Sequence, residues 1–306
     1  MKLGLCIIVR DEAERLESCL ADIVDLFDDI AIVDTGSVDG TPEILKDRLG
    51  ITPLVAAAGS HETFGWTAAR NLACSKVGTP WILMLDADER VTREGLQALK
   101  GMGDDPGVAG YFCEWRTFCN GSEIEDYKLP IFRKGMTYAG LIHENVQSHL
   151  RDRRLAAKWL SAFRIAHYPD ERRMEVKRRL YVQRLRSALE QLPHWYRYHW
   201  FLGYNLLRHG DRDGARRLLM QAADSDSRAF PVECLNSKVV VAHLCAQDGD
   251  ASQARLVLQS ARDFHAQVAE DFEVRINFRL KPWIDRALEH CARLELDRIQ
   301  PYEFMY

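Results

Sequence analysis

The sequence predicts an α/β domain with a parallel, helix-covered sheet, followed by an all-α region. The first observation is an opening in which apolar runs alternate with helical patterns, in the order strand, helix, strand, helix. The second is a continuous apolar run at residues 81–85, typical of a strand buried on both faces. The third is a helical pattern with small residues that recurs after residue 200. A chain of 306 residues accommodates one large or two ordinary domains.

Composition and charge narrow the classes of function. The chain is 47% hydrophobic and 28% charged, as globular proteins are, and its net charge of −4 does not indicate a nucleic-acid partner. No apolar run reaches the length of a membrane span, and the first residues lack a signal-peptide cleavage site. The eight cysteines show no zinc spacing, so we expect reduced thiols in a cytoplasmic protein.

Strands and helices are expected to alternate in the first third of the chain. In order, we expect a strand at 3–9, a helix at 11–27, a strand at 30–33, a helix from 41, a strand at 52–56, a loop at 61–66 and a short helix ending near 78. Thr41 and Pro42 are the expected cap and first position of the second helix. Asp34 ends the second strand, where it either accepts a hydrogen bond from a nucleobase or ribose or closes the turn over Gly36.

An acidic motif, Asp86-Ala87-Asp88-Glu89, directly follows the apolar run at 81–85. Ligands bind at the carboxyl ends of strands in open α/β sheets. If the backbone stays extended, Asp86 and Asp88 project to the same side, where they suit Mg²⁺ or Mn²⁺ with phosphates completing the shell. A solvated acidic turn is the alternative. Arg70 has no acidic residue one turn away, which makes it available for a phosphate.

Four sequence blocks together resemble the family 2 glycosyltransferases, in the bacterial branch that carries helical repeats after the catalytic domain. The blocks are CIIVRDEAERLESCL, IVDTGSVDGTPEI, FGWTAARNLA and WILMLDADE, in this order. The resemblance implies a GT-A fold with a Rossmann-like, mixed but mainly parallel sheet at residues 1–168 and a tetratricopeptide-like domain at 169–306. It also implies a nucleoside-diphosphate sugar as donor, with UDP favoured, and Mn²⁺ or Mg²⁺ as cofactor.

The resemblance assigns roles by motif position. It places Val9, Arg10 and Glu12 in the nucleoside pocket, Asp34 at the base, Arg70 near the diphosphate, Asp86 near the ribose or metal, and Asp88 on the metal.

A further family block has a glycine before His-Glu, which Gly140, His143 and Glu144 match. Displacement at an anomeric carbon needs a base opposite the leaving group, so Glu144 is the expected general base, with His143 orienting it or helping to bind the donor. An exposed glutamate beside a structural histidine is the alternative. His167 is the expected third metal ligand, and a packed histidine at a domain junction is the alternative reading. Pro130 stands where the family usually has an arginine.

The middle of the chain is expected to contain a helix from Thr92 and a hairpin. The hairpin comprises strands at 108–118 and 128–133 around the Asn120-Gly121 turn. Residues 151–186 carry twelve Lys and Arg against four acidic residues. We favour one solvated face of a helix for this segment, and the alternative is contact with an anionic acceptor or a peripheral contact with a membrane.

Two copies of a tetratricopeptide-like pattern follow a predicted helix at 174–192. Gly210-Asp211 and Gly249-Asp250 mark the two turns, 39 residues apart, and a final helix is expected at 283–294. Two repeats cannot bury a core alone, so we expect them to pack on the preceding helix. Their surface either binds a peptide acceptor or serves stabilisation or homodimerisation.

We therefore predict a metal-dependent, inverting glycosyltransferase that moves a hexose or N-acetylhexosamine to a peptide or a surface glycan. The acceptor is left open between a cysteine or serine of a small peptide and a lipopolysaccharide or other glycan. A non-catalytic scaffold with an inert first domain is the alternative from another class. A nucleotidyltransferase would be expected to show a glycine-rich phosphate loop after the first strand, where Arg10-Asp11-Glu12 stands instead.

Overall fold

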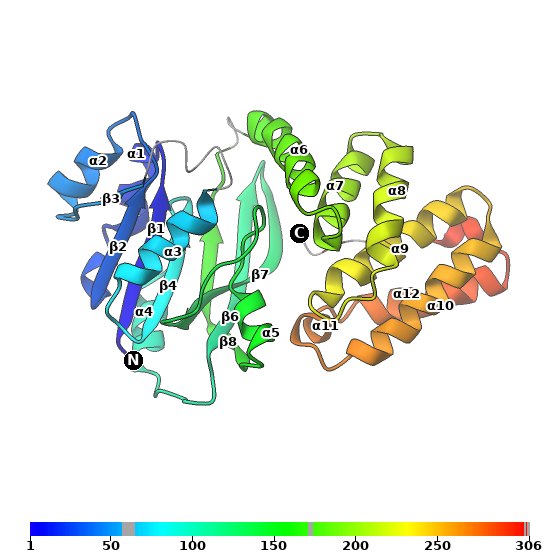
Figure 1. Cartoon of the computed structure of the whole chain (residues 1–306). Helices are drawn as coiled ribbons and strands as arrows, with labels where there is room; N and C mark the ends of the chain where they lie inside the picture. Colours follow the sequence, from blue (N-terminus) through cyan, green and yellow to red (C-terminus); the bar gives the residue numbers. More distant parts are fainter. Residues whose placement is uncertain (57–64, 171–173, 303, 305–306) are drawn as a thin grey trace. The chain divides into compact units, whose positions relative to one another are not determined.

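The computed structural model describes all residues except 57–64, 171–173, 303 and 305–306 (Figure 1). The chain divides into two compact units, Met1–Glu175 and Val176–Phe304. Most of the loop expected at 61–66 lies outside the described residues.

The first unit is built on an eight-stranded mixed sheet in the order β3-β2-β1-β4-β7-β6-β8-β5 (Figure 1). The strands are β1 (Leu3–Val9), β2 (Asp29–Asp34), β3 (Leu54–Val55), β4 (Trp81–Asp86), β5 (Glu89–Arg90), β6 (Gly110–Cys119), β7 (Ser122–Arg133) and β8 (Ala157–His167). The pairings around β1 and β2 and the pairing of β6 with β8 are parallel, whereas β7 is antiparallel to both its neighbours. The expected mixed, mainly parallel sheet is confirmed.

The core of this unit lies around the central strands. Leu5 and Ile7 of β1 and Leu83 and Leu85 of β4 are fully buried, as the continuous apolar runs predict. The helices are α1 (Ala13–Leu20), α2 (Thr41–Glu43), α3 (Trp66–Lys76), α4 (Arg93–Gly101) and α5 (Gln147–Asp152), with a 3₁₀ turn η1 (Val24–Leu26) and a π turn η2 (Ile44–Arg48). Burial of these strands requires helices on the sheet, and α1 and α4 supply buried leucines to the same core.

Two helix starts differ from the prediction. The first helix begins after Asp11, which has a left-handed φ of 55°, and α1 ends well before residue 27. Thr41 does not cap α2, because Gly40 occupies that position. Instead the Thr41 hydroxyl accepts a hydrogen bond from the backbone N of Glu12 at 2.8 Å. This threonine therefore ties α2 to the loop that follows β1.

The predicted hairpin is present, and its second strand is longer than expected. Asn120 and Gly121 have φ values of 49° and 72°, the left-handed pair that a tight hairpin turn requires. The strand β7 starts at Ser122 rather than at residue 128. Its polar first half is stabilised across the hairpin, where Arg116 pairs with Glu125 at 3.0 Å and also with Glu123.

The helical interpretation of the basic segment at 151–186 is wrong for its first half. Residues 157–167 form β8, which pairs in parallel with β6 and buries Leu160, Phe163 and Ile165. Two of its basic side chains are ion-paired: Lys158 contacts Asp105 at 2.7 Å, and Arg164 contacts Glu114 at 3.5 Å. The strand is hard to predict from the sequence because its many charged residues are typical of a helix surface, and its buried residues are few and irregularly spaced.

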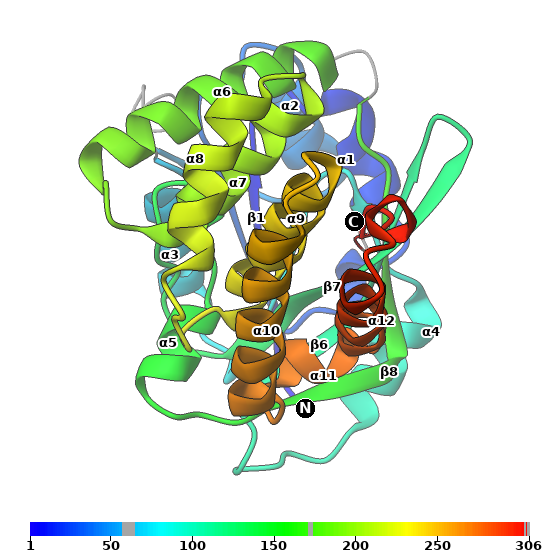
Figure 2. The same cartoon turned by 90° about the vertical axis from the view of Figure 1, so that its right-hand side faces the viewer.

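The second unit is all helical (Figure 2). Its helices are α6 (Met174–Gln191), which begins just before the unit boundary, α7 (Tyr196–Arg208), α8 (Arg212–Ala223), α9 (Pro231–Gln247), α10 (Ala251–Val268), α11 (Phe272–Ile276) and α12 (Leu280–Ala292), followed by a 3₁₀ turn η4 (Leu296–Arg298). The expected all-α region is confirmed.

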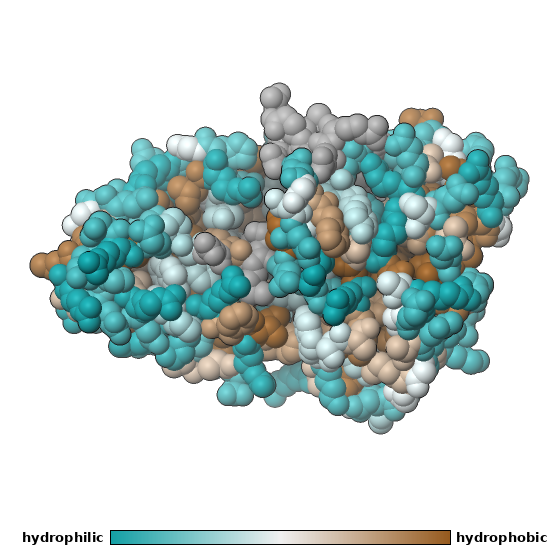
Figure 3. Space-filling model, turned by 180° about the vertical axis from the view of Figure 1, so that it is seen from behind, coloured by the Kyte–Doolittle hydropathy of each residue, from teal (hydrophilic) through white to brown (hydrophobic). Residues whose placement is uncertain are grey.

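Both predicted repeats are helical hairpins with the same turn chemistry. Gly210 and Gly249 have φ values of 84° and 78°, which favour glycine. Asp211 and Asp250 then cap α8 and α10 by accepting backbone hydrogen bonds. Among the described residues no helix is long and apolar enough to cross a membrane. The face drawn in Figure 3 is mostly hydrophilic.

Candidate active site

The carboxyl end of β4 carries a connected group of charges. Arg70, on α3, donates from Nη2 to Asp86 Oδ1 at 2.8 Å and from Nε to Glu144 Oε1 at 3.0 Å. Lys128, on β7, donates from Nζ to Asp86 Oδ2 at 3.0 Å and to Glu89 Oε1 at 2.6 Å. We call these five residues the charge cluster. Each carboxylate oxygen of Asp86 thus has a cationic partner.

Mutual charge compensation controls ionisation in the charge cluster. Burial opposes ionisation of Asp86, but Arg70 and Lys128 outweigh it and hold the pKa of Asp86 well below its usual range. Burial also opposes the charges on Arg70 and Lys128, but the neighbouring carboxylates raise the pKa of both cations. Glu89 behaves differently: burial raises its pKa, and Lys128 only partly opposes this.

Glu89 holds the backbone of the acidic motif in place through its buried carboxylate. Its side chain is fully buried, and Oε2 accepts a hydrogen bond from the backbone N of Asp86 at 2.9 Å. Its Oε1 accepts one from Trp115 Nε1 at 2.6 Å, in addition to Lys128. Glu89 therefore fixes the backbone at the end of β4 and with it the position of Asp86.

Asp88 faces a different group of side chains, because the backbone turns between β4 and β5. Its Oδ2 lies 3.5 Å from His167 Nε2, and both side chains are partly exposed. His167 Nδ1 is 3.0 Å from the Thr117 hydroxyl, and its ring stacks on Trp115 with centroids 4.6 Å apart. The histidine is therefore fixed in orientation, with Nε2 directed at Asp88.

The loop that contains His143 and Glu144 is held against α3. The side chain of Asn71 forms two hydrogen bonds with the backbone of Tyr138, at 2.7 and 3.0 Å, and Ala139 bridges to Asn145. His143 has a left-handed φ of 52°. These contacts place Glu144 beside Arg70, where only 9% of its side chain is exposed.

The ends of β1, β2 and β4 lie side by side. Val9 is in register with Asp34, and the preceding residue, Ile8, is in register with Asp86. Asp34 is buried, and its Oδ1 accepts hydrogen bonds from the backbone N of Gly36 and of Ser37, at 2.9 and 2.8 Å. Asp34 therefore does close the turn over Gly36.

The segment after β1 is anchored through Glu12. Its carboxylate pairs with Arg15 at 2.6 Å, and Arg15 also contacts the buried Asp170 at 2.6 Å. Arg10 is half-buried in the same segment. The residues assigned to the nucleoside pocket thus lie along one edge of the sheet, together with the charge cluster.

Residues 5–156 match the family model described as glycosyl transferase family 2. The match includes the whole charge cluster, the acidic motif and the ends of β1, β2 and β4. These residues belong to glycosyl transferase family 2. The predicted resemblance is confirmed, and the first unit contains a glycosyltransferase domain.

Curated relatives match this chain over part of their length. A tetratricopeptide repeat-containing protein of Synechococcus elongatus is 39% identical over 107 residues, which are 34% of this chain and 25% of the relative. An uncharacterized glycosyltransferase of Rickettsia bellii is 29% identical over 93 residues, 30% of each chain. The chain thus spans about a quarter to a third of the curated relatives it matches.

Two solved structures align with 97% of this chain and 88% of their own. One is a fragment of S. aureus TarS, with 14% identity and a TM-score of 0.47. The other is a mannosyltransferase from Pyrobaculum calidifontis in complex with GDP-mannose and Mn²⁺, with 15% identity and a TM-score of 0.49.

The family 2 domain brings several predicted residues together and separates others. Asp86, Arg70 and Glu144 form one network, although no acidic residue lies one helical turn from Arg70 in the sequence. Its partners come from β4 and from the loop before α5, which local spacing cannot show. Asp88 and His167 form a separate pair.

Sequence reasoning missed Lys128 and the structural role of Glu89. Lys128 stands two residues before Pro130 on β7, and side chains two apart on a strand share a face. Pro130 stands where the family usually has an arginine, so a nearby lysine on the same face of the strand could have been predicted to supply the positive charge instead. The buried position of Glu89 had no comparable signal, because its partner Trp115 comes from another strand.

A divalent ion fits part of the predicted ligand set. Among the described residues, no three His, Cys, Asp or Glu side chains are grouped to hold a metal. Asp88 and His167 nevertheless offer one carboxylate and one imidazole, donors that suit Mn²⁺ when substrate phosphates complete the shell. Asp86 is engaged by two cations and is a less available ligand.

Proposed function

We propose that the family 2 domain binds a nucleoside-diphosphate sugar, with UDP favoured, at the ends of β1, β2 and β4. It then transfers a hexose or N-acetylhexosamine to a peptide or surface-glycan acceptor. The observation that carries the proposal concerns Arg70. This side chain is buried among carboxylates, yet its Nη1 has no hydrogen-bond partner among the residues that the structure describes. An unsatisfied buried donor costs about 1–3 kcal/mol, and a diphosphate oxygen would satisfy it.

The nucleoside half of the donor is proposed to lie along Val9, Arg10, Glu12 and Asp34. The hydrogen bonds to Asp34 from its own turn use Oδ1. The turn thereby holds the side chain rigidly and leaves Oδ2 as the oxygen for the base. Rigid positioning of this kind lowers the entropic cost of binding.

The metal is proposed to be held by Asp88 and His167, with Asp86 near the ribose or the ion. When bound, Mn²⁺ or Mg²⁺ would neutralise the departing diphosphate. Thr117 and Trp115 hold the His167 ring so that Nε2 faces Asp88. Arg70 supplies further fixed positive charge at the site.

Glu144 is proposed to take the acceptor's proton in a single displacement that inverts the anomeric centre. Its Oε1 is held by Arg70 at 3.0 Å, which orients the carboxylate and leaves Oε2 for the acceptor. His143, one residue earlier on the same held loop, is proposed to orient this loop or to contact the donor sugar.

Calorimetry with UDP, GDP, CDP and dTDP sugars, each with and without Mn²⁺, tests this function. We expect one nucleotide sugar to bind, and only with metal. A sugar that binds equally without metal would overturn the metal assignment. Absence of binding across the panel would overturn the donor site and favour the non-catalytic scaffold.

A further inference from the structure

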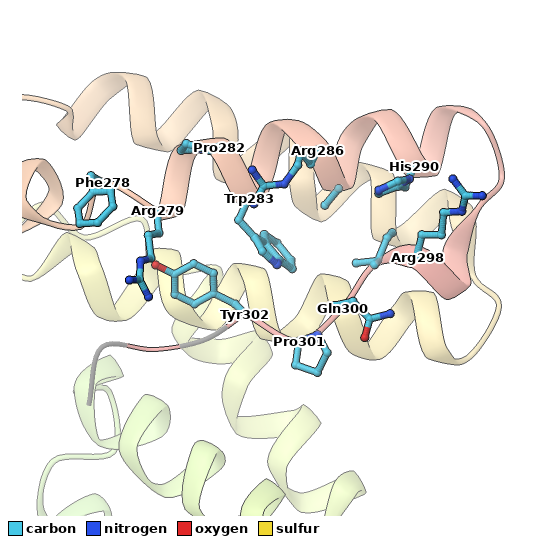
Figure 4. Close-up of a pocket in the computed structure, with 12 residues that line it drawn as sticks. Phe278, Arg279, Pro282, Trp283, Arg286, His290, Arg298, Gln300, Pro301 and Tyr302 are labelled. Atoms are coloured by element: carbon cyan, nitrogen blue, oxygen red, sulfur yellow. The ribbon is translucent and has the colours of Figure 1, made fainter. Parts of the chain in front are cut away.

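A pocket of about 510 Å³ lies within the second unit, between α12 and the chain at residues 298–302 (Figure 4). We call it the α12 pocket. On the helical side, the lining residues recur every three or four positions, as residues on one face of a helix do. The polar and aromatic residues on this side are Arg279, Trp283, Arg286 and His290. The lining residues that the structure describes all belong to the second unit.

The floor of the α12 pocket is aromatic and fixed. The rings of Trp283 and Tyr302 meet edge to face, with centroids 5.8 Å apart and an interplanar angle of 86°. The Tyr302 hydroxyl donates to Asn277 Oδ1 at 2.5 Å, which anchors the ring. Pro282 and Pro301 add apolar surface on either side. Such a floor suits an apolar side chain of a ligand.

The rim of the pocket is cationic. Arg279 and Arg286 are exposed, and neither forms an ion pair with any residue that the structure describes. Arg298 and His290 share the carboxylate of Glu295, at 3.5 and 3.0 Å. Among the described lining residues there is no Asp or Glu. Within the part of the chain that the structure describes, no carboxylate compensates Arg279 and Arg286, which favours an anionic ligand.

We propose that the α12 pocket binds an acidic peptide segment in which two carboxylates flank an apolar side chain. Arg279 and Arg286 are seven positions apart, about 10 Å along a helix at 1.5 Å per residue. In an extended chain every second side chain lies on the same face, so two carboxylates four residues apart, with the apolar side chain midway between them, face the pocket together and span about 13 Å, within reach of the two long arginine side chains. The carboxylates contact the two arginines, and the apolar side chain between them rests on Trp283 and Tyr302.

A glycan fits this lining less well than a peptide. Each sugar hydroxyl both donates and accepts hydrogen bonds, so a sugar needs carboxylate or amide acceptors around it. Gln300 supplies the one side-chain carbonyl in the described lining. The proposal goes beyond glycosyl transfer, and its failure would leave the donor-site proposal untouched.

Fluorescence anisotropy of the full chain with a labelled peptide tests the proposal. The peptide carries two glutamates four residues apart with a leucine midway between them, and its control carries glutamines instead. We expect saturable binding of the acidic peptide and weaker binding as salt rises. Arg279→Gln and Arg286→Gln should each weaken it about tenfold, as expected for the loss of a charge-assisted contact.

Arg262→Gln is the matched control, because this arginine is 52% exposed on α10 and lies outside the pocket. It should leave peptide affinity unchanged. Equal affinity for the two peptides, or full affinity in the Arg279→Gln/Arg286→Gln double variant, would overturn the proposal. Binding of a sulphated polysaccharide without binding of the peptide would overturn it as well.

Discussion

Removing Lys128 should destabilise the first unit in a pH-dependent way. In Lys128→Met, the fully buried Glu89 loses its cation and keeps only the hydrogen bonds from Trp115 and the backbone of Asp86. Removing one partner of a buried ion pair costs about 3–5 kcal/mol. We expect about 3 kcal/mol, since the Lys128 side chain is 24% exposed. For a unit of this size, that loss lowers Tm by about 6–12 °C.

The pH dependence follows from the raised pKa of Glu89. Because its pKa is higher in the folded state, its contribution to stability is complete below its ordinary value of 4.5 and is lost as the pH rises through the folded value. Lys128 lowers that pKa in the native chain, so the variant raises it further. The part of the loss in Lys128→Met that comes from Glu89 should therefore be small near pH 4.5 and grow toward neutral and alkaline pH, whereas the part that comes from Asp86, which stays ionised over this range, should be constant.

Differential scanning calorimetry at several pH values measures this effect. Lys158→Met is the matched control, because Lys158 has an ion pair of similar length, 2.7 Å, but is 60% exposed. Its removal should cost below about 1 kcal/mol. The double variant Lys128→Met/Glu89→Gln should recover the part of the loss that comes from Glu89, but not the part that comes from Asp86. A pH-independent loss, or a double variant no more stable than the single one, would refute the reasoning.

Three further predictions concern the chemistry and the second unit. Glu144→Gln should abolish sugar transfer in a radiolabel assay while calorimetry finds donor binding nearly unchanged; retained transfer would exclude Glu144 as the base. Asp88→Ala should weaken Mn²⁺-dependent donor binding in the same calorimetry, and an unchanged metal requirement would refute the ligand assignment. Gly203→Ala should cost about 1–3 kcal/mol, because the new Cβ would lie 2.9 Å from Leu219 Cγ. Its thermal unfolding should be compared with Gly101→Ala, where the added Cβ meets nothing within 4 Å, and equal Tm values would contradict the packing argument.

The sequence predicts correctly those strands and turns whose stability depends on residues close together in the chain. The strands β1 and β4 follow from continuous apolar runs, because burial on both faces requires them. The Asn120-Gly121 turn and the Gly-Asp turns of the repeats follow from the backbone angles that these residues favour. These elements need few partners that the sequence does not place nearby.

Elements that depend on distant partners were predicted poorly. The strand β8 is held by parallel pairing with β6, whose paired residues lie 47 to 50 positions earlier, and its charged residues resemble a helix surface. The first half of β7 is polar and depends on cross-strand pairs with Arg116. In both cases the stabilising contact comes from another strand, so no local window contains it.

The candidate site divides in the same way. The sequence by itself determined that Asp86 and Asp88 follow a buried strand and that Arg70 and Glu144 lie in family motifs. Only the tertiary structure decided that Arg70 bridges Asp86 and Glu144 and that Lys128 completes the network. The physical reason is that buried charges must be paired, and the fold supplies each partner from a different strand, helix or loop.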